Sequence, residues 1–250
     1  MFYGYDFRAW QEEGIRIRNN IPIKTHCNML CVGSSGSGKS YALLTMLGSL
    51  VKEKESIDIT FCDFKQSADF EFLQGYPKYF AGENTYDGIM DYYSDFTKAR
   101  NGEEHIRHVL ITDEYPSFLV YLQSIDKKKY NDVMAAYAQM LMLGRGTSNG
   151  FGIWTICQRP DSAFFSLGSR LNYMIFISLG HLTSETKKMM FEGEDIPIDT
   201  VYRQGEGLLL ADGRRITEVK FPMIKDLDNW KSHIRQALLS SDEKVDVQLF

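Results

Sequence analysis

The sequence lacks the residue patterns that define several classes of protein. It has only four cysteines, Cys27, Cys31, Cys62 and Cys157, and no two of them have the C-x-x-C spacing of a zinc or redox site. The five histidines are scattered, and none belongs to an H-E-x-x-H motif of a zinc protease. Three of the cysteines lie in apolar, strand-like runs. We therefore expect reduced core cysteines in an intracellular, cytoplasmic protein.

Long apolar runs are also missing. No run approaches the roughly 18–20 residues that a membrane-spanning helix needs. The first residues, from Met1 to Asp6, lack the basic and then apolar pattern of a secretory signal. We expect no transmembrane segment, so that recruitment to a membrane would need an anchored partner protein.

Neither the charge nor the apolar content is extreme. Hydrophobic residues make up 44% of the 250 residues, charged residues make up 24%, and the formal net charge is −5. These values are ordinary for a soluble globular protein with one large α/β domain or two small ones. The acidic balance argues against a surface coated with basic side chains for nucleic acid, but it leaves room for a local basic stripe.

The sequence does contain a glycine- and serine-rich stretch that fits the pattern G-x-x-x-x-G-K-[ST] at every fixed position. Its residues are Gly33, Ser34, Ser35, Gly36, Ser37, Gly38, Lys39 and Ser40. Glycines let the main chain turn sharply, so that its N–H groups can wrap a polyphosphate. Lys39 can place its ammonium against the β and γ phosphates, and the Ser40 hydroxyl can ligate Mg²⁺.

The surroundings of this stretch favour a phosphate-binding loop over a flexible linker. Residues 27–32 form an apolar run typical of a buried strand, and apolar residues recur at helical spacing from Tyr41 to Leu50. Linkers are not flanked by a core strand and an amphipathic helix. We predict an α/β fold of the P-loop NTPase (RecA-like) type, with a mostly parallel central sheet flanked by helices. Tyr41 is included in the predicted nucleotide-binding segment.

A second informative stretch is residues 108–114, a β-branched and leucine-rich run that ends in two acids. In phosphate-loop ATPases such acids lie beside the nucleotide. We expect Asp113 to hold Mg²⁺, and Glu114 to orient or deprotonate the attacking water. A solvated strand end is the alternative interpretation.

A third strand is predicted at residues 151–157, followed by Gln158. Ligand sites in open α/β sheets gather at the carboxyl ends of the strands, so we expect Gln158 to lie near Asp63 and Asp113. The Gln158 amide could hydrogen-bond the γ-phosphate or the attacking water. The alternative is a glutamine that only caps the strand.

The remaining elements are less specific. We predict a strand at residues 56–62, helices at 86–100, 127–143, 184–191 and 226–240, and a strand at 172–177. Asp212 and Gly213 mark a hairpin between residues 207–211 and 216–220. The helix at 127–143 opens with Lys127, Lys128 and Lys129, which are either a solvated helix start or a basic loop that faces DNA. Residues 1–24 are weakly patterned.

The order of these motifs resembles the FtsK/HerA superfamily of ring ATPases, and most of all the FtsK/SpoIIIE motor domain and its mobile-element relatives. The similar segments are residues 26–40, 63–65, 75–77, 113–114, 144–145, 150–153, 158–160 and 205–210. The resemblance covers residues 25–225, between an N-terminal extension at 1–24 and a C-terminal helix and polar tail at 226–250. Cys157 departs from the family pattern, which often has threonine there. No winged-helix module follows, so sequence-directed DNA loading is not expected.

The resemblance implies a homo-hexamer with ATP and Mg²⁺ between subunits, double-stranded DNA in the central pore, and an arginine supplied by the neighbouring subunit. Arg145 is the first candidate for that arginine and Arg170 the second, and a structural ion pair is the alternative for either.

The implied function is an ATP-hydrolysing motor that translocates DNA in conjugative transfer, segregation or packaging. A related ATPase that energises protein secretion is the alternative, which the acidic charge mildly favours. A non-hydrolysing, nucleotide-dependent assembly protein is a third, and Glu114 argues against it.

Overall fold

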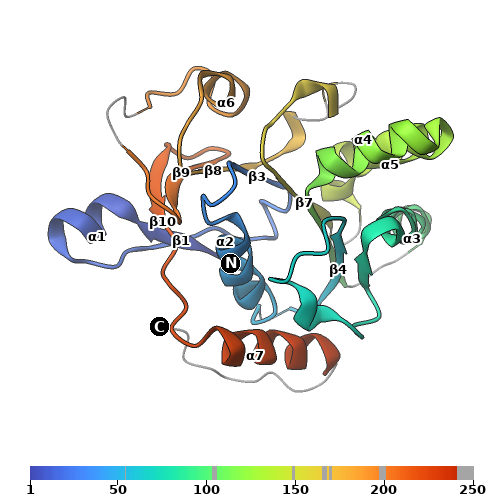
Figure 1. Ribbon diagram of the computed structural model, residues 1–250, viewed down its shortest axis with the longest axis horizontal. Helices are drawn as coiled ribbons and strands as arrows, with labels where there is room; N and C mark the ends of the chain where they lie inside the picture. Colours follow the sequence, from blue (N-terminus) through green and yellow to red (C-terminus); the bar gives the residue numbers. More distant parts are fainter. Residues whose placement is uncertain are drawn as a thin grey trace.

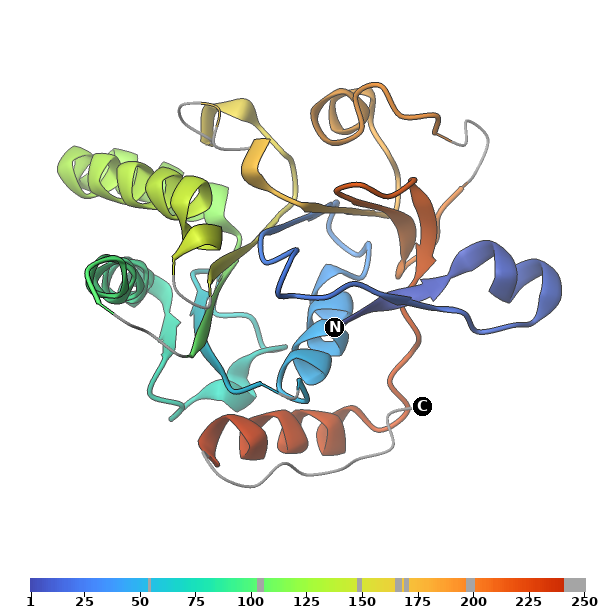
Figure 2. The ribbon, with the colours of Figure 1, turned by 180° about the vertical axis from the view of Figure 1, so that it is seen from behind.

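Ten strands form one sheet that carries helices on both faces, as the computed structural model of the chain shows (Figures 1 and 2). The structure describes residues 1–53, 55–102, 106–147, 150–164, 168, 171–196 and 201–240. The strand order is β2-β1-β10-β9-β8-β3-β7-β6-β4-β5. The predicted α/β fold with a mostly parallel central sheet is confirmed.

The parallel part of the sheet runs from β8 to β5. It contains β8 (Ile175–Leu179), β3 (Met29–Gly33), β7 (Phe151–Cys157), β6 (Arg107–Asp113), β4 (Ile57–Asp63) and β5 (Tyr79–Ala81). Every residue of β3, β6 and β7 is buried. Helices cover both faces of such strands, which explains why they read as continuous apolar runs in the sequence. The carboxyl ends of these strands meet at one edge, which we call the carboxyl edge. The opposite side is the amino edge.

The antiparallel part extends the sheet beyond β8. The predicted hairpin is present as β9 (Glu206–Ala211) and β10 (Thr217–Lys220), and β1 (Phe2–Asp6) and β2 (Arg18–Asn20) follow. The weakly patterned N-terminal residues thus supply two strands, joined by helix α1 (Phe7–Glu13). Four of the five residues of β1 are buried, so the strand lacks the apolar–polar alternation that would have revealed it.

The helices divide between the two faces. Helices α2 (Lys39–Leu50) and α7 (Leu227–Leu239) pack on one face, and α7 crosses beneath α2 in both ribbon views (Figures 1 and 2). Helices α3 (Thr85–Arg100), α4 (Tyr115–Ile125), α5 (Lys127–Leu143) and α6 (Ser184–Met190) pack on the other face. Short 3₁₀ turns complete the chain at η1 (Glu71–Leu73), η2 (Gly82–Asn84), η3 (Gly144–Gly146) and η4 (Ser162–Phe164). Within the ranges given above, no helix combines the length and the apolarity needed to cross a bilayer.

Two further elements differ from the sequence-based expectation. Helix α4 was not predicted, because Pro116 and the exposed apolar residues Val120 and Ile125 blur its periodicity. Strand β8 begins at Ile175 rather than at residue 172. The Asn28 carbonyl accepts hydrogen bonds from the N–H groups of both Met174 and Ile175, at 3.1 Å each, and the parallel ladder with β3 starts there.

Candidate nucleotide-binding site

The phosphate loop (residues 33–40) connects the end of β3 to the start of α2, as predicted. Gly38 precedes the helix with φ of 95°, in the left-handed region that glycine tolerates best. A Cβ at this position would also lie 2.7 Å from the Gly205 amide nitrogen. Glycine is therefore required at Gly38 both for its conformation and for the space it leaves.

A neighbouring segment fixes one side of the phosphate loop. The Gly205 N–H donates to the Ser37 carbonyl at 2.8 Å, and the Ser37 N–H donates to the Ser34 carbonyl at 3.2 Å. The Ser37 side chain is buried, and its Oγ has no hydrogen-bond partner among the described residues. Ser34, Ser35 and Gly36 are exposed. The base of the loop is thus held by the segment before β9, while its tip is accessible to a ligand.

Lys39 and Ser40 are the first two residues of α2. The Lys39 ammonium donates to the Gly33 carbonyl at 2.5 Å and to the Ser34 carbonyl at 3.1 Å, so it lies over the phosphate loop. The Tyr41 hydroxyl donates to the Ile224 carbonyl at 3.0 Å and accepts from the Ile224 N–H at 3.1 Å. Tyr41 therefore ties α2 to the segment before α7, and its hydroxyl is engaged there.

Asp113 is the last residue of β6, at the carboxyl edge. It pairs in register with Ile156 of β7 on one side and with Asp63 of β4 on the other. Burial, and after it the charges of Glu114 and Asp63, raise the pKa of Asp113 to about 7, whereas the charges of Lys39 and Lys65 oppose the shift. Asp113 thus lies in a strongly negative, desolvated environment within electrostatic reach of the phosphate-loop lysine.

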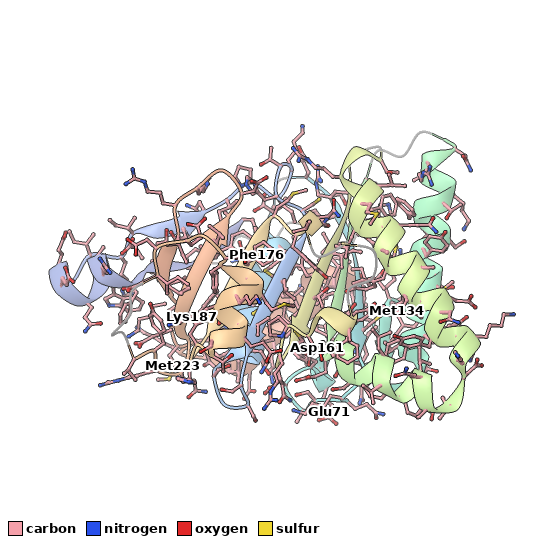
Figure 3. The ribbon with its side chains drawn as sticks, turned by 90° about the horizontal axis from the view of Figure 1, so that it is seen from above. Glu71, Met134, Asp161, Phe176, Lys187 and Met223 are labelled. Atoms are coloured by element: carbon pink, nitrogen blue, oxygen red, sulfur yellow. The ribbon has the colours of Figure 1, made fainter. Side chains whose placement is uncertain are left out.

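Glu114 follows Asp113 and precedes α4. Its φ of 55° is in the left-handed region, which is unusual for a residue with a side chain. Its Oε1 accepts a hydrogen bond from the Gln158 amide Nε2 at 3.1 Å. Gln158 follows the last residue of β7, so two adjacent strands deliver the acid and the amide to the same point. Asp161 and Glu71, which follow β7 and β4 in the chain, mark this edge in Figure 3.

Asp63 completes the row of polar side chains at the carboxyl edge. Its Oδ2 accepts from the Ser67 N–H at 2.9 Å and from the Tyr79 hydroxyl at 3.0 Å. Its Oδ1 is buried and has no hydrogen-bond partner among the described residues. Burial raises the pKa of the Asp63 carboxyl, although these hydrogen bonds oppose the shift.

The side chains at this edge fit a magnesium ion that takes some of its ligands from the protein and the others from phosphates. Within the described parts of the chain, no cluster of three or more His, Cys, Asp or Glu side chains could hold a metal by itself. Mg²⁺ in phosphate-transfer sites, however, takes one or two protein oxygens together with phosphate oxygens and water. Asp113 and the Ser40 hydroxyl are oxygen donors of this kind, and a dication beside Asp113 would offset the repulsion from Glu114 and Asp63.

Arg145 lies away from these residues. It is an exposed residue of η3, which precedes β7 and lies at the amino edge. A strand of seven residues is roughly 20 Å long, so Arg145 is far from the phosphate loop of its own chain. Arg170, the second candidate for the same role, lies outside the described residues.

Lys127, Lys128 and Lys129 are exposed at the start of α5. Asp126 caps this helix, and its Oδ1 accepts from the N–H groups of Lys128 and Lys129 at 3.0 Å each. The Lys129 ammonium lies 4.5 Å from the centroid of the Tyr86 ring. These contacts hold the helix start in place and leave the charges of Lys127 and Lys128 at the surface.

Comparison with known proteins shows what the chain is similar to. No protein-family model matches it. The FtsK domain-containing protein YdcQ of Bacillus subtilis (strain 168) is 25% identical over 229 residues, a match that covers 85% of this chain and 46% of YdcQ. The chain thus spans less than half of that relative.

Solved structures of other proteins share the fold, TcpA and EccC among them. The pCW3 conjugation coupling protein TcpA, in a monomer form with ATPγS, has a TM-score of 0.64 and 19% identity, and the match covers 88% of this chain and 64% of that one. The cytoplasmic domain of the Thermomonospora curvata type VII secretion ATPase EccC has a TM-score of 0.67 and 17% identity, with 95% of this chain and 30% of that one covered. The predicted resemblance to FtsK/HerA ATPases is confirmed, and the fold is that of their P-loop domains.

Proposed function

We propose that this chain, which is similar to an FtsK domain-containing protein and has the fold of FtsK/HerA-type ATPases, binds ATP at the phosphate loop and hydrolyses it at the carboxyl edge. The observation that carries the proposal is the 3.1 Å hydrogen bond between Gln158 and Glu114, directly beside the buried Asp113. A non-hydrolysing assembly protein has no need of an acid and an amide held together in this place.

The phosphate loop binds the polyphosphate through its main-chain N–H groups and the Lys39 ammonium, together with the positive end of the α2 dipole. Ser40 and Asp113 would hold Mg²⁺, which when bound neutralises phosphate charge. Because the pKa of free Asp113 is about 7, binding a dication there releases protons near neutral pH.

Glu114 accepts a proton from the attacking water, and Gln158 orients the Glu114 carboxylate through its amide. The Gln158 amide also hydrogen-bonds the γ-phosphate, so that loss of this phosphate on hydrolysis is linked to movement of the residues at this edge. Arg145 lies at the amino edge, so we assign it to the site of a neighbouring subunit, where a guanidinium stabilises charge in the transition state. This assignment requires an oligomer, for which we propose a homo-hexamer.

The finer function that we propose is translocation of double-stranded DNA. TcpA, which has the same fold, is a conjugation coupling protein, and this likeness supports DNA as the cargo. Lys127, Lys128 and Lys129 are the proposed backbone contacts. Protein secretion is the second candidate, because EccC is a secretion ATPase and the net charge of this chain is −5. In either case we place the protein in the cytoplasm, with a partner protein that recruits it to the membrane.

The deciding experiment is ATP hydrolysis with and without linear duplex DNA, at two salt concentrations. A DNA motor is expected to hydrolyse ATP faster with DNA, and the stimulation should fall steeply at the higher salt because backbone contacts release counterions. Replacing Lys127, Lys128 and Lys129 with glutamine should weaken the stimulation and leave the DNA-free rate unchanged. Hydrolysis that is indifferent to DNA supports the secretion alternative, and no hydrolysis with intact nucleotide binding supports the assembly protein.

A further inference from the structure

A chain of hydroxyl groups lies buried behind the acid pair. We call it the hydroxyl cluster, and it consists of Thr112 of β6, Tyr137 of α5, Thr155 of β7 and Tyr173, which precedes β8. The Tyr137 hydroxyl lies 2.6 Å from Thr155 Oγ1 and donates to Thr112 Oγ1 at 3.4 Å. Thr155 Oγ1 lies 2.5 Å from the Tyr173 hydroxyl. All four side chains are buried, so these contacts replace the water that their hydroxyls would otherwise bind.

Tyr137 contacts the chain on both sides of the acid pair. Thr112, which its hydroxyl reaches, directly precedes Asp113. Tyr115, which directly follows Glu114, stacks on the Tyr137 ring with centroids 4.1 Å apart and planes 17° apart. One side chain of α5 therefore holds the end of β6 and the start of α4, and Asp113 and Glu114 lie between these two contacts.

The same hydroxyl also reaches the strand that carries Gln158. Thr155 is the register partner of Thr112, so the two threonines lie side by side on neighbouring strands. Gln158 follows three residues after Thr155. Because the Tyr137 hydroxyl is hydrogen-bonded to both threonines, it fixes β6 and β7 relative to one another. The contacts lie near the ends of the two strands, shortly before Glu114 and Gln158.

The backbone at Glu114 needs such support. A non-glycine residue in the left-handed region is strained and persists only where its surroundings impose that conformation. The Tyr115–Tyr137 stack and the Tyr137–Thr112 hydrogen bond hold the chain on both sides of the strained Glu114.

We propose that Tyr137 is a positioning residue for ATP hydrolysis, which acts by holding Glu114 in its strained conformation and in register with Gln158. The inference rests on the proposed function of this site and adds a residue that the sequence motifs do not include. Tyr137 lies on the face of the sheet that α5 covers, where Met134 is labelled in Figure 3, and it acts on Glu114 through Thr112, Thr155 and Tyr115.

The test compares Tyr137→Phe with Tyr92→Phe. Tyr92 is also a buried tyrosine on this face, and its hydroxyl donates to the Gly152 carbonyl of β7 at 2.8 Å, away from the acid pair. Each variant removes one buried hydroxyl, so their melting temperatures should fall by similar amounts. We expect Tyr137→Phe to lower kcat about 10-fold or more and to leave the Kd for ATPγS within twofold, because a small misplacement of a catalytic group slows chemistry without weakening binding. Tyr92→Phe should leave kcat unchanged. Equal kcat in the two variants would overturn the proposal.

A second pair of variants distinguishes the loss of a hydroxyl from a general loss of folding. Thr155→Ser keeps a hydroxyl at the centre of the cluster, and Thr155→Val removes it. We expect Thr155→Ser to retain kcat within about threefold, and Thr155→Val to reproduce the loss seen in Tyr137→Phe. Equal activity in the serine and valine variants contradicts a role for the hydroxyls.

Hydrogen exchange separates failure of this inference from failure of the proposed function. In Tyr137→Phe, amides of residues 113–119 should exchange several-fold faster than in the unsubstituted protein, and Tyr92→Phe should leave them unchanged. This readout needs no hydrolysis. If the unsubstituted protein does not hydrolyse ATP, the proposed function fails whatever the exchange shows. If it hydrolyses ATP and the 113–119 amides exchange equally in both variants, the positioning role fails alone.

Discussion

At the scale of single residues, the buried acids of the carboxyl edge lower the stability of the protein when nucleotide and metal are absent. Asp63, Asp113 and Glu114 bring three carboxyl groups together, and each has little solvent around it. The pKa of Asp113 rises to about 7 as a result. Such concentrated charge of one sign is destabilising by itself, and it is the property by which the edge would bind the proposed dication.

This arrangement predicts a pH-dependent stability difference in Asp113→Asn. The folded-state pKa of about 7 exceeds the ordinary aspartate value of 3.8, so between these pH values the folded protein binds more protons than the unfolded chain. Stability contributed by protonated Asp113 is therefore present at low pH and lost as pH rises through 7. Without nucleotide and Mg²⁺, the variant should melt at a higher temperature than the unsubstituted protein at pH 8, and the gain should shrink at pH 5. A gain of equal size at both pH values would contradict the assigned pKa.

A second residue-scale prediction concerns the proposed base. Glu114→Gln keeps the size of the side chain and an oxygen that can accept from Gln158, but it removes the group that takes the proton. We expect kcat to fall at least about 100-fold with an unchanged Kd for ATPγS. Lys39→Ala should instead lose nucleotide binding, because Lys39 acts on the phosphates. The two effects are separated by measuring steady-state hydrolysis and equilibrium binding on the same samples.

At the scale of elements, α7 is part of the structural support of the phosphate loop. Trp230 of α7 packs on Gly48 of α2, where any side chain would collide with the indole ring, and its Nε1 donates to the Leu44 carbonyl at 3.0 Å. The Tyr41 hydroxyl holds the segment that leads into α7. Helix α2 therefore packs between the sheet and α7. The orientation of its N-terminal end, next to the phosphate loop, depends on the contacts made by Trp230 and by the Tyr41 hydroxyl.

Trp230→Ala should lower the free energy of unfolding by about 3–5 kcal/mol, because it empties a buried aromatic site and removes a hydrogen bond to the helix. Leu239→Ala, at a half-exposed position on the same helix, is the matched control and should cost less than about 1 kcal/mol. Denaturant titration of both variants measures the difference. Similar losses in the two variants would mean that α7 packs only loosely on α2.

At the scale of the whole molecule, the N-terminal residues complete the sheet. Strand β1 pairs with β10 through Tyr5 and Lys220, and the Phe2 N–H donates to the Ser49 hydroxyl of α2 at 2.9 Å. Tyr3 is fully buried in the core on the α2 face. Removing these residues would open the core and leave β10 as an unpaired edge.

A variant lacking residues 1–24 should therefore melt at a lower temperature and aggregate at micromolar concentration, since an exposed strand edge pairs with other chains. Differential scanning fluorimetry and light scattering test this expectation. A variant that ends at residue 240 keeps every described element and serves as the control. If the shortened N-terminal variant stayed monomeric and equally stable, the first two strands would be an accessory to the fold rather than a part of it.

The site and the fold were predictable from sequence to different degrees. The phosphate loop, the acid pair and the strand before Gln158 carry local patterns, because their chemistry needs particular residues at consecutive positions. Strand β1 carries no such pattern, since four of its five residues are buried and the apolar–polar alternation on which prediction depends is lost. Helix α4 carries none because the apolar residues Val120 and Ile125 are exposed and blur its periodicity. Tyr137 could not have been singled out, because an aromatic residue at helical spacing indicates a core position whatever its hydroxyl contacts.

The sequence by itself determined that a glycine loop follows a buried strand and precedes a helix, and that acids and an amide end two other strands. Residues adjacent in the chain suffice for this, since backbone conformation is a local property. Only the tertiary structure decided that Glu114 and Gln158 meet at 3.1 Å, that Arg145 lies at the opposite edge, and that one tyrosine joins the two strands from behind. These are contacts between distant parts of the chain, and they follow from the order of the strands in the sheet, which residues adjacent in the chain do not specify.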